Sequence, residues 1–217
     1  MRVISLIQQK GGVGKTTISV HLAHELKAME PNKRVVVADA DPQASATKWV
    51  QRGRANGYNG VDVVAVATDG TGKGLREELL RTKADIVVLD LPPSIEAVSL
   101  RGALYADLML VPVGASALDL ESADKALEVC EEAIQLDAKK SFLLVPSKVD
   151  RRTSAGRELR DALGKRGPIA GTSIHLRVDY ADAATMGCGV GEYAPDSDAH
   201  KEMRMLATET LKALGGQ

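Results

Sequence analysis

Short apolar runs alternate along the chain with longer stretches in which apolar residues recur every three to four positions. Continuous runs of Val, Ile and Leu are typical of strands buried on both faces of a sheet, and the recurring pattern is typical of helices with one buried face. The predicted strands are residues 3–7, 34–38, 61–66, 86–89, 108–113 and 142–145. The predicted helices between them are residues 16–27, 44–54, 74–83, 95–105 and 118–136.

The last third of the chain continues this alternation less regularly. A polar helix is predicted over residues 154–165, a short strand over 172–175 and a final helix over 198–214, while residues 68–74 indicate a surface loop. Repeated strand–helix units favour right-handed crossovers between parallel strands. We therefore expect an α/β fold with a doubly wound, mainly parallel sheet of about seven or eight strands flanked by helices, as one domain over residues 1–217.

Composition narrows the function classes. Apolar residues make up 44% of the 217 residues and aromatic residues only 3%, so aliphatic side chains must fill the core. The net charge of −1 does not mark the whole chain as a nucleic-acid binder, so any contact with a polyanion must come from a local patch. The two cysteines form no C-x-x-C pair, which argues against a zinc site. With no leader-like or membrane-length apolar run, we expect a cytoplasmic protein without a membrane partner.

The stretch QQKGGVGKTT, residues 8–17, follows the first predicted strand and opens the first predicted helix. In this context glycines let the backbone wrap a polyphosphate, and the helix N-terminus adds oriented N–H donors. Lys15 can reach the β- and γ-phosphates, and the Thr16 hydroxyl can ligate Mg²⁺, so ATP and Mg²⁺ are the predicted cofactors; the alternative is an ordinary glycine-rich turn. The predicted phosphate-binding residues are Gly11, Gly12, Val13, Gly14, Lys15, Thr16 and Thr17.

A second lysine distinguishes this loop. The standard pattern has a glycine where Gln9 stands, and Lys10 follows it. The form K-G-G-x-G-K-T resembles the deviant phosphate loop of the ParA/MinD family of P-loop ATPases, which also includes nitrogenase iron protein. The resemblance implies that Lys10 reaches across a dimer interface to the phosphates of the partner's ATP, which gives it a catalytic role beside Lys15. A lysine placed before the tight turn projects away from its own cradle; the alternative is a solvated side chain.

Two acidic motifs follow at strand ends. Asp39 and Asp41 belong to a D-x-D-P-Q segment, and Asp90 precedes L-P-P-S after the fourth predicted strand. Carboxylates at the carboxyl ends of parallel strands lie beside the phosphate loop. By resemblance to the same family, Asp41 orients the attacking water, Asp39 helps to hold hydrated Mg²⁺, and Asp90 binds Mg²⁺ through water. The L-P-P-S loop, which ends at Ser94, resembles the loop that senses the γ-phosphate; for Asp41, helix capping is the alternative.

The resemblance extends over essentially the whole chain and is weaker after residue 145. Pro112 and the D-L pair at residues 119–120 match one family segment, and Ser147 and Lys148 occupy positions where relatives contact the base, with Ser147 in place of a typical Asn. Residues 177–193 also resemble the C-terminal region of the family.

Among the branches, the chain is most similar to short ParA-type partition ATPases without an N-terminal winged helix. The cysteine positions do not suit nitrogenase iron protein, and no tyrosine-rich kinase tail is seen. The resemblance implies an ATP-dependent homodimer that binds DNA nonspecifically on the nucleoid and positions a cargo with a ParB-like adaptor that stimulates hydrolysis. Two alternatives stay open: a MinD-like membrane-associated positioning ATPase, and a metabolic ATP-dependent enzyme on the same fold.

A basic stretch is the candidate for DNA contact. Its cations are Arg151, Arg152, Arg157, Arg160, Lys165 and Arg166, and Arg177, Lys201 and Arg204 follow later. Phosphate contacts need such side chains on one face, but a solvated helix face explains the same stretch equally well.

Overall fold

Buried aliphatic strands build a single parallel sheet. The computed structural model describes residues 1–66, 71–93 and 96–215. The strands within them are β1 (Arg2–Leu6), β2 (Val35–Asp39), β3 (Asp62–Ala65), β4 (Ile86–Asp90), β5 (Leu108–Val113) and β6 (Ser141–Pro146). They pair in the order β3-β2-β4-β1-β5-β6, every pair parallel. The N-terminal strand therefore lies inside the sheet, with β4 on one side and β5 on the other.

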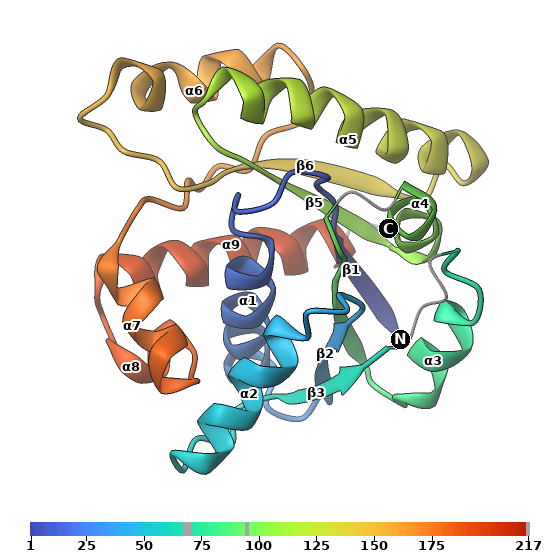
Figure 1. Ribbon diagram of the computed structural model, residues 1–217, viewed down its shortest axis with the longest axis vertical. Coiled ribbons are helices and arrows are strands. Elements are labelled where there is room, and N and C mark those ends of the chain that lie inside the picture. The colour runs from blue at the N-terminus through green and yellow to red at the C-terminus, as the bar shows by residue number, and fades with distance from the viewer. Residues whose placement is uncertain (67–70, 94–95, 216–217) are drawn as a thin grey trace.

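Helices cover both faces of the sheet (Figure 1). They are α1 (Lys15–Met29), α2 (Ser45–Ala55), α3 (Leu75–Arg81), α4 (Glu96–Tyr105), α5 (Ala117–Leu136), α6 (Ser154–Gly164), α7 (Val178–Met186), α8 (Val190–Tyr193) and α9 (Asp198–Gly215). Residues of α1, α2, α7, α8 and α9 share one apolar core with the sheet, and residues of α3, α4, α5 and α6 share the other. The protein is thus a three-layer α/β/α structure.

Side-chain alternation along the strands supplies both cores. In β2, Val35 and Val37 belong to the α1 side, whereas Val36 and Ala38 belong to the α5 side. All five β2 residues are buried. This explains why the strand is a continuous apolar run and not an alternating one, because a sheet covered on both faces has no polar face.

The predicted α/β class, the parallel sheet and the six central strand runs are confirmed, but the count of seven or eight strands is not. The predicted strand at residues 172–175 forms only an isolated bridge between Val149 and His175. Residues 168–170, just before it, lie beside β6, where the Pro168 carbonyl and the Ala170 amide both bond to Leu144. Pro168 has no N–H to offer to the ladder, which interrupts pairing at this edge.

Other differences concern helices. The short helices α7 and α8 were not predicted, since neither shows a clear apolar repeat over its 9 and 4 residues. Residues 68–70 of the predicted loop, residue 95 of the predicted fourth helix and Ser94 of the predicted sensing loop lie outside the described residues.

A buried tryptophan joins three elements on the α1 side. Trp49 of α2 is 7% exposed, and its indole N–H donates to the Cys188 carbonyl at 3.2 Å. Its ring meets the ring of His21 on α1 edge-on, with centroids 4.9 Å apart. Nearby, Gly53 and Gly187 bring α2 and the end of α7 so close that a Cβ on Gly53 would lie 2.0 Å from the Gly187 carbonyl oxygen. The two segments therefore pack backbone against backbone.

Candidate functional site

The glycine loop connects β1 to α1 at the carboxyl edge of the sheet. Gly12 and Gly14 have φ values of 80° and 99°, a region that only glycine enters without strain. The tight turn delivers the chain directly into α1, so the free amides of its first turn face the loop. A helix N-terminus framed in this way is an anion-binding site. The adjoining cavity, of about 190 Å³, is lined by Gly11, Gly12, Gly14, Lys15, Thr16, Thr17, Asp41, Pro93 and Lys148.

Lys15 lies inside this cradle. Lys15 as a whole is 7% exposed, and its ammonium is 3.4 Å from the Lys10 carbonyl oxygen. Burial lowers the pKa of Lys15, while the carboxylates of Asp90 and Asp41 oppose that shift. A buried ammonium facing a cavity suits an anionic ligand, and the contact of Lys15 with a polyphosphate stays a prediction.

Asp90, at the end of β4, faces two hydroxyls of α1. Thr16 donates to one carboxylate oxygen at 2.7 Å and Ser19 donates to the other at 2.9 Å. Burial raises the pKa of Asp90 to about 6, although these two hydrogen bonds oppose the shift. Ser19 was not predicted, but it stands one turn after Thr16, and residues at i and i+3 share a helix face.

Asp39 and Asp41 follow β2, and Asp39 is in register with Asp90 across the β2–β4 pair. The buried carboxylate of Asp39 accepts from the backbone N–H and the hydroxyl of Thr47, at 2.8 and 2.9 Å. Asp41 lines the phosphate cavity, and its carboxylate accepts from the Gln43 amide at 2.9 Å. Asp39 therefore anchors the start of α2, and Asp41 is the acid nearer to the cradle.

The oxygen donors beside the cradle suit Mg²⁺. Among the described residues no three His, Cys, Asp or Glu side chains converge on one point. Mg²⁺ does not require such a cage, because it usually keeps several waters and takes one or two protein ligands together with substrate phosphates. Thr16 and Asp90, whose oxygens are 2.7 Å apart, supply that number of ligands.

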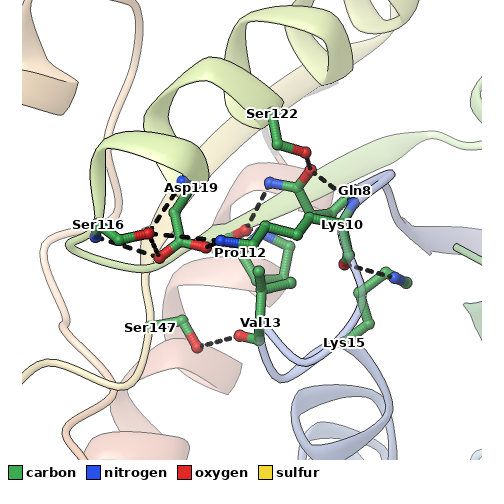
Figure 2. Close-up of polar contacts among 9 residues, drawn as sticks. All are labelled: Gln8, Lys10, Val13, Lys15, Pro112, Ser116, Asp119, Ser122 and Ser147. Carbon is green, nitrogen blue, oxygen red and sulfur yellow. Dashed lines mark hydrogen bonds and ion pairs between the residues drawn. The ribbon is translucent and has the colours of Figure 1, made fainter. Parts of the chain in front are cut away.

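Lys10 points away from the cradle. Figure 2 shows its side chain running toward the start of α5, where the ammonium lies 2.6 Å from Asp119 and 3.4 Å from the Ser116 hydroxyl. The side chain of Lys10 is 34% exposed and that of Asp119 is 15% exposed. Burial alone would raise the pKa of Asp119, but the hydrogen bonds from Lys10 and Ser116 outweigh it and lower the pKa. The two lysines of the loop therefore point in different directions: Lys15 lines the phosphate cavity, and Lys10 contacts the start of α5.

Gln8, which precedes the glycine loop, is held by hydrogen bonds to α5 and β5. Ser122 donates to the Gln8 side-chain oxygen at 2.5 Å, and the Gln8 amide group donates to the Pro112 carbonyl at 3.1 Å (Figure 2). The Gln8 oxygen also accepts from the Lys10 backbone at 3.3 Å. Pro112 is buried in β5 and is not among the described residues that line the phosphate cavity or its neighbour. Its expected contact with a nucleotide therefore stays a prediction.

A second cavity, of about 210 Å³, opens beside the cradle and shares Gly14, Thr17 and Lys148 with it. Its other described walls come from Ile18, Ser147, Ile174, His175, Leu176, Arg177, Tyr180, Ala181 and Ala184. The hydroxyl of Ser147 donates to the Val13 carbonyl at 2.8 Å, so this residue fastens the glycine loop to the end of β6. Ser147 and Lys148 both line this cavity, and residues 174–184 complete it; their contact with a base stays a prediction.

The basic stretch is less free than its composition suggests. Arg152 pairs with Asp150 at 2.8 Å, and Arg166 pairs with Asp124 at 2.7 Å. Arg160 donates to a backbone carbonyl and to Ser173. Later in the chain, Arg177 pairs with Asp198 and Glu202. Of the cations in the predicted DNA-binding set, six make no ion pair with the described residues: Arg151, Arg157, Arg160, Lys165, Lys201 and Arg204.

None of the helices that the structure describes has the length and apolar character needed to span a bilayer.

Comparisons with known proteins agree with this geometry. The profile of the CobQ/CobB/MinD/ParA nucleotide binding domain matches residues 4–187. The maintenance of carboxysome distribution protein A of Halothiobacillus neapolitanus is 29% identical over 96% of this chain and 95% of its own length. The protein of that name from Gloeobacter kilaueensis is 34% identical over 96% and 93%. The chromosome-partitioning ATPase Soj of Thermus thermophilus is 29% identical over 97% and 96%.

Solved structures agree on the fold. The septum site-determining protein MinD of Pyrococcus horikoshii, complexed with Mg-ADP, superposes with a TM-score of 0.79 at 18% identity over 99% of this chain and 97% of its own. A putative plasmid partition protein of Borrelia burgdorferi bound to AMPPNP superposes with a TM-score of 0.73 at 20% identity over 97% and 98%. The chain therefore belongs to the CobQ/CobB/MinD/ParA family of nucleotide-binding domains and, within it, to the positioning ATPases of ParA/MinD type.

Proposed function

We propose that the protein is an ATPase that dimerises on ATP, binds DNA nonspecifically and positions a cargo with an adaptor protein that stimulates hydrolysis. The cargo class is a plasmid, a chromosome or a protein complex, as in the relatives named for chromosome partitioning and carboxysome distribution. One observation carries the proposal: the loop holds a lysine inside the phosphate cradle and a second lysine, 34% exposed, outside it. A cation that the cradle does not use is available to the nucleotide of another copy.

The residues around the cradle divide the work of phosphoryl transfer, which depends on positioning and charge neutralisation. Lys15 and the loop amides would hold the phosphates, and Thr16 and Asp90 would hold Mg²⁺, which neutralises charge on the phosphate oxygens. Asp41 lines the same cavity and would orient the attacking water. Asp39, in register with Asp90, would act through the water shell of the ion.

Dimer formation would exchange one partner of Lys10 for another. In a single protomer its ammonium is held by Asp119 at 2.6 Å. A triphosphate carries more negative charge than one carboxylate and is the stronger partner for an ammonium at short range. ATP bound by one copy would therefore draw Lys10 from the other copy, and hydrolysis would weaken that attraction.

The test of this step is the mass of the particle with and without Mg-ATP, measured by light scattering after gel filtration. We expect the wild type to become a dimer with ATP and Lys10→Ala to bind ATP but stay single. Lys139→Ala, at an exposed lysine before β6, is the control and should dimerise normally. A wild type that stays single at saturating ATP, or a Lys10→Ala variant that dimerises as well as the wild type, contradicts the proposal.

DNA binding would use the cations that lack a carboxylate partner. Weak patches on two copies gain affinity when a dimer presents them together, which would make binding to the nucleoid depend on ATP. DNA retention should fall steeply with salt, and Arg151→Ala with Lys165→Ala should reduce the salt slope by about one unit for each lost phosphate contact. The Lys139→Ala variant again serves as the control. Retention on anionic vesicles with ATP, without retention on DNA, would instead favour a membrane-associated positioning ATPase.

A further inference from the structure

The carboxylate of Glu202, on α9, accepts hydrogen bonds from three residues that line the second cavity. Glu202 has a side chain that is 12% exposed. Its Oε1 atom accepts from His175 Nδ1 at 2.7 Å and from Arg177 Nε and Nη2 at 2.9 and 2.7 Å. Its Oε2 atom accepts from the His175 backbone N–H at 3.1 Å and from the Tyr180 hydroxyl at 3.3 Å. All five donors belong to residues that line the cavity.

The hydrogen bonds to Glu202 matter for this part of the cavity wall, because its first residues belong to no helix or strand. Residues 171–176 belong to no named strand or helix, and their backbone bonds to the end of β6 and the residues after it are few: Ile174 bonds to Pro146 and Val149, and Leu176 bonds to Val149. Side-chain hydrogen bonds therefore add to the support of this segment. The side chain of Glu202 is only 12% exposed, and it bonds to both ends of the stretch from His175 to Tyr180, so it helps to fix where that stretch lies relative to Gly14 and Thr17.

We propose that Glu202 is a positioning residue for the nucleoside half of the nucleotide: it holds the wall formed by His175, Arg177 and Tyr180 beside the phosphate cradle. The inference rests on the proposed function, since it takes ATP as the ligand. The cavity shares Gly14, Thr17 and Lys148 with the phosphate cavity, so a nucleotide whose phosphates fill the cradle has its nucleoside at this wall. Glu202 therefore contributes to nucleotide affinity without touching the phosphates.

Glu202→Gln is the sharpest change. The amide nitrogen cannot accept a hydrogen bond, so whichever carboxylate position it takes loses every donor there: two donors at Oε2 or three at Oε1. The chain also supplies a matched control. Glu209, two turns later on α9, accepts from the Gly171 backbone and the Thr172 hydroxyl at 2.7 and 2.5 Å, and neither residue lines the cavity.

The experiment compares two ligands by calorimetry, Mg-ATP and Mg-tripolyphosphate, because the second carries phosphates without a nucleoside. We expect Glu202→Gln to raise the Kd for ATP about tenfold, as for the loss of a hydrogen bond to a charged group, with an unchanged Kd for tripolyphosphate. Hydrolysis should show a raised KM and a kcat within about twofold of the wild type. Glu209→Gln should leave both dissociation constants unchanged. His175→Ala, a milder change in the same wall, should repeat the loss for ATP alone if Glu202→Gln does not fold.

The outcomes separate the two proposals. A wild type that binds neither ligand refutes the proposed function. A wild type that binds ATP no more tightly than tripolyphosphate, or a Glu202→Gln variant that binds ATP normally, overturns the role of this wall while the proposed function stands. Equal losses for both ligands also overturn it, because they would mark Glu202 as a general support of the fold.

Discussion

Asp90→Asn should stabilise the folded protein while disabling it. In the free protein this carboxylate is fully buried against Thr16 and Ser19, and burial raises its pKa from 3.8 to about 6. At about 1.36 kcal/mol for each pH unit, holding the ionised form in this place costs about 3 kcal/mol at neutral pH. Asparagine has a similar shape and no charge to bury, and the hydroxyl of Thr16 or Ser19 that faces its amide nitrogen can rotate to accept a hydrogen bond. The free energy of unfolding should therefore rise by up to about 3 kcal/mol at pH 7.5.

The sign of the pH dependence follows from the raised pKa. A group with a higher pKa in the folded state stabilises the fold below its unfolded pKa, and this contribution is lost as the pH rises through the folded value. The gap between Asp90→Asn and the wild type should thus be small near pH 4 and grow as the pH rises through about 6. Urea unfolding at both ends of this range, with chelator and without nucleotide, measures the gap.

Two controls make the test decisive. Glu128→Gln removes one negative charge at an exposed position of α5 and shows what the change in net charge does alone. The same Asp90→Asn protein should lose Mg²⁺-dependent hydrolysis, since an amide is a poorer ligand for the ion. An Asp90→Asn protein that is less stable than the wild type at pH 7.5, or a gap that does not change with pH, refutes the reasoning.

Three further predictions concern the loop and the packing around it. Asp119→Asn removes the charge that holds Lys10, so the ATP concentration for half-maximal dimerisation should fall several-fold in light scattering, and a rise would contradict the competition between Asp119 and ATP. Gly53→Ala drives a Cβ into the Gly187 carbonyl and should lower the free energy of unfolding by about 1–3 kcal/mol, whereas Gly164→Ala, with open space around it, should change stability little. Ser147→Ala removes the hydrogen bond to the Val13 carbonyl and should weaken ATP binding by about 1 kcal/mol in calorimetry; unchanged affinity would mean that the loop holds itself.

The parts of the site that sequence alone predicts are those set by local pattern. The glycine loop, Lys15 and Thr16 lie together because a strand, a turn and a helix follow one another directly. Asp39 and Asp90 are also predictable, since the ends of parallel strands meet at one edge of the sheet. In both cases the chain's own order supplies the geometry.

The remaining contacts depend on which distant segments pack together. Asp119 lies 109 positions from Lys10, and only the placement of the start of α5 beside the loop after β1 makes them an ion pair. Glu202 reaches His175 because α9 returns along the sheet beside an irregular segment. The missing strand near residue 172 has a similar origin, since interrupted pairing at the β6 edge decides it, and an apolar pattern carries no information about pairing.

The position of Trp49 gives the molecule a built-in optical reporter. It is the sole tryptophan of the chain, and it contacts both His21 on the phosphate-loop helix and the Cys188 carbonyl. Because burial lowers the pKa of His21 to about 3, the imidazole beside the indole stays neutral at ordinary pH and does not quench its emission as a cation would. A change in fluorescence on adding nucleotide would therefore report movement at this junction of α1, α2 and the α7–α8 corner, with no label to attach.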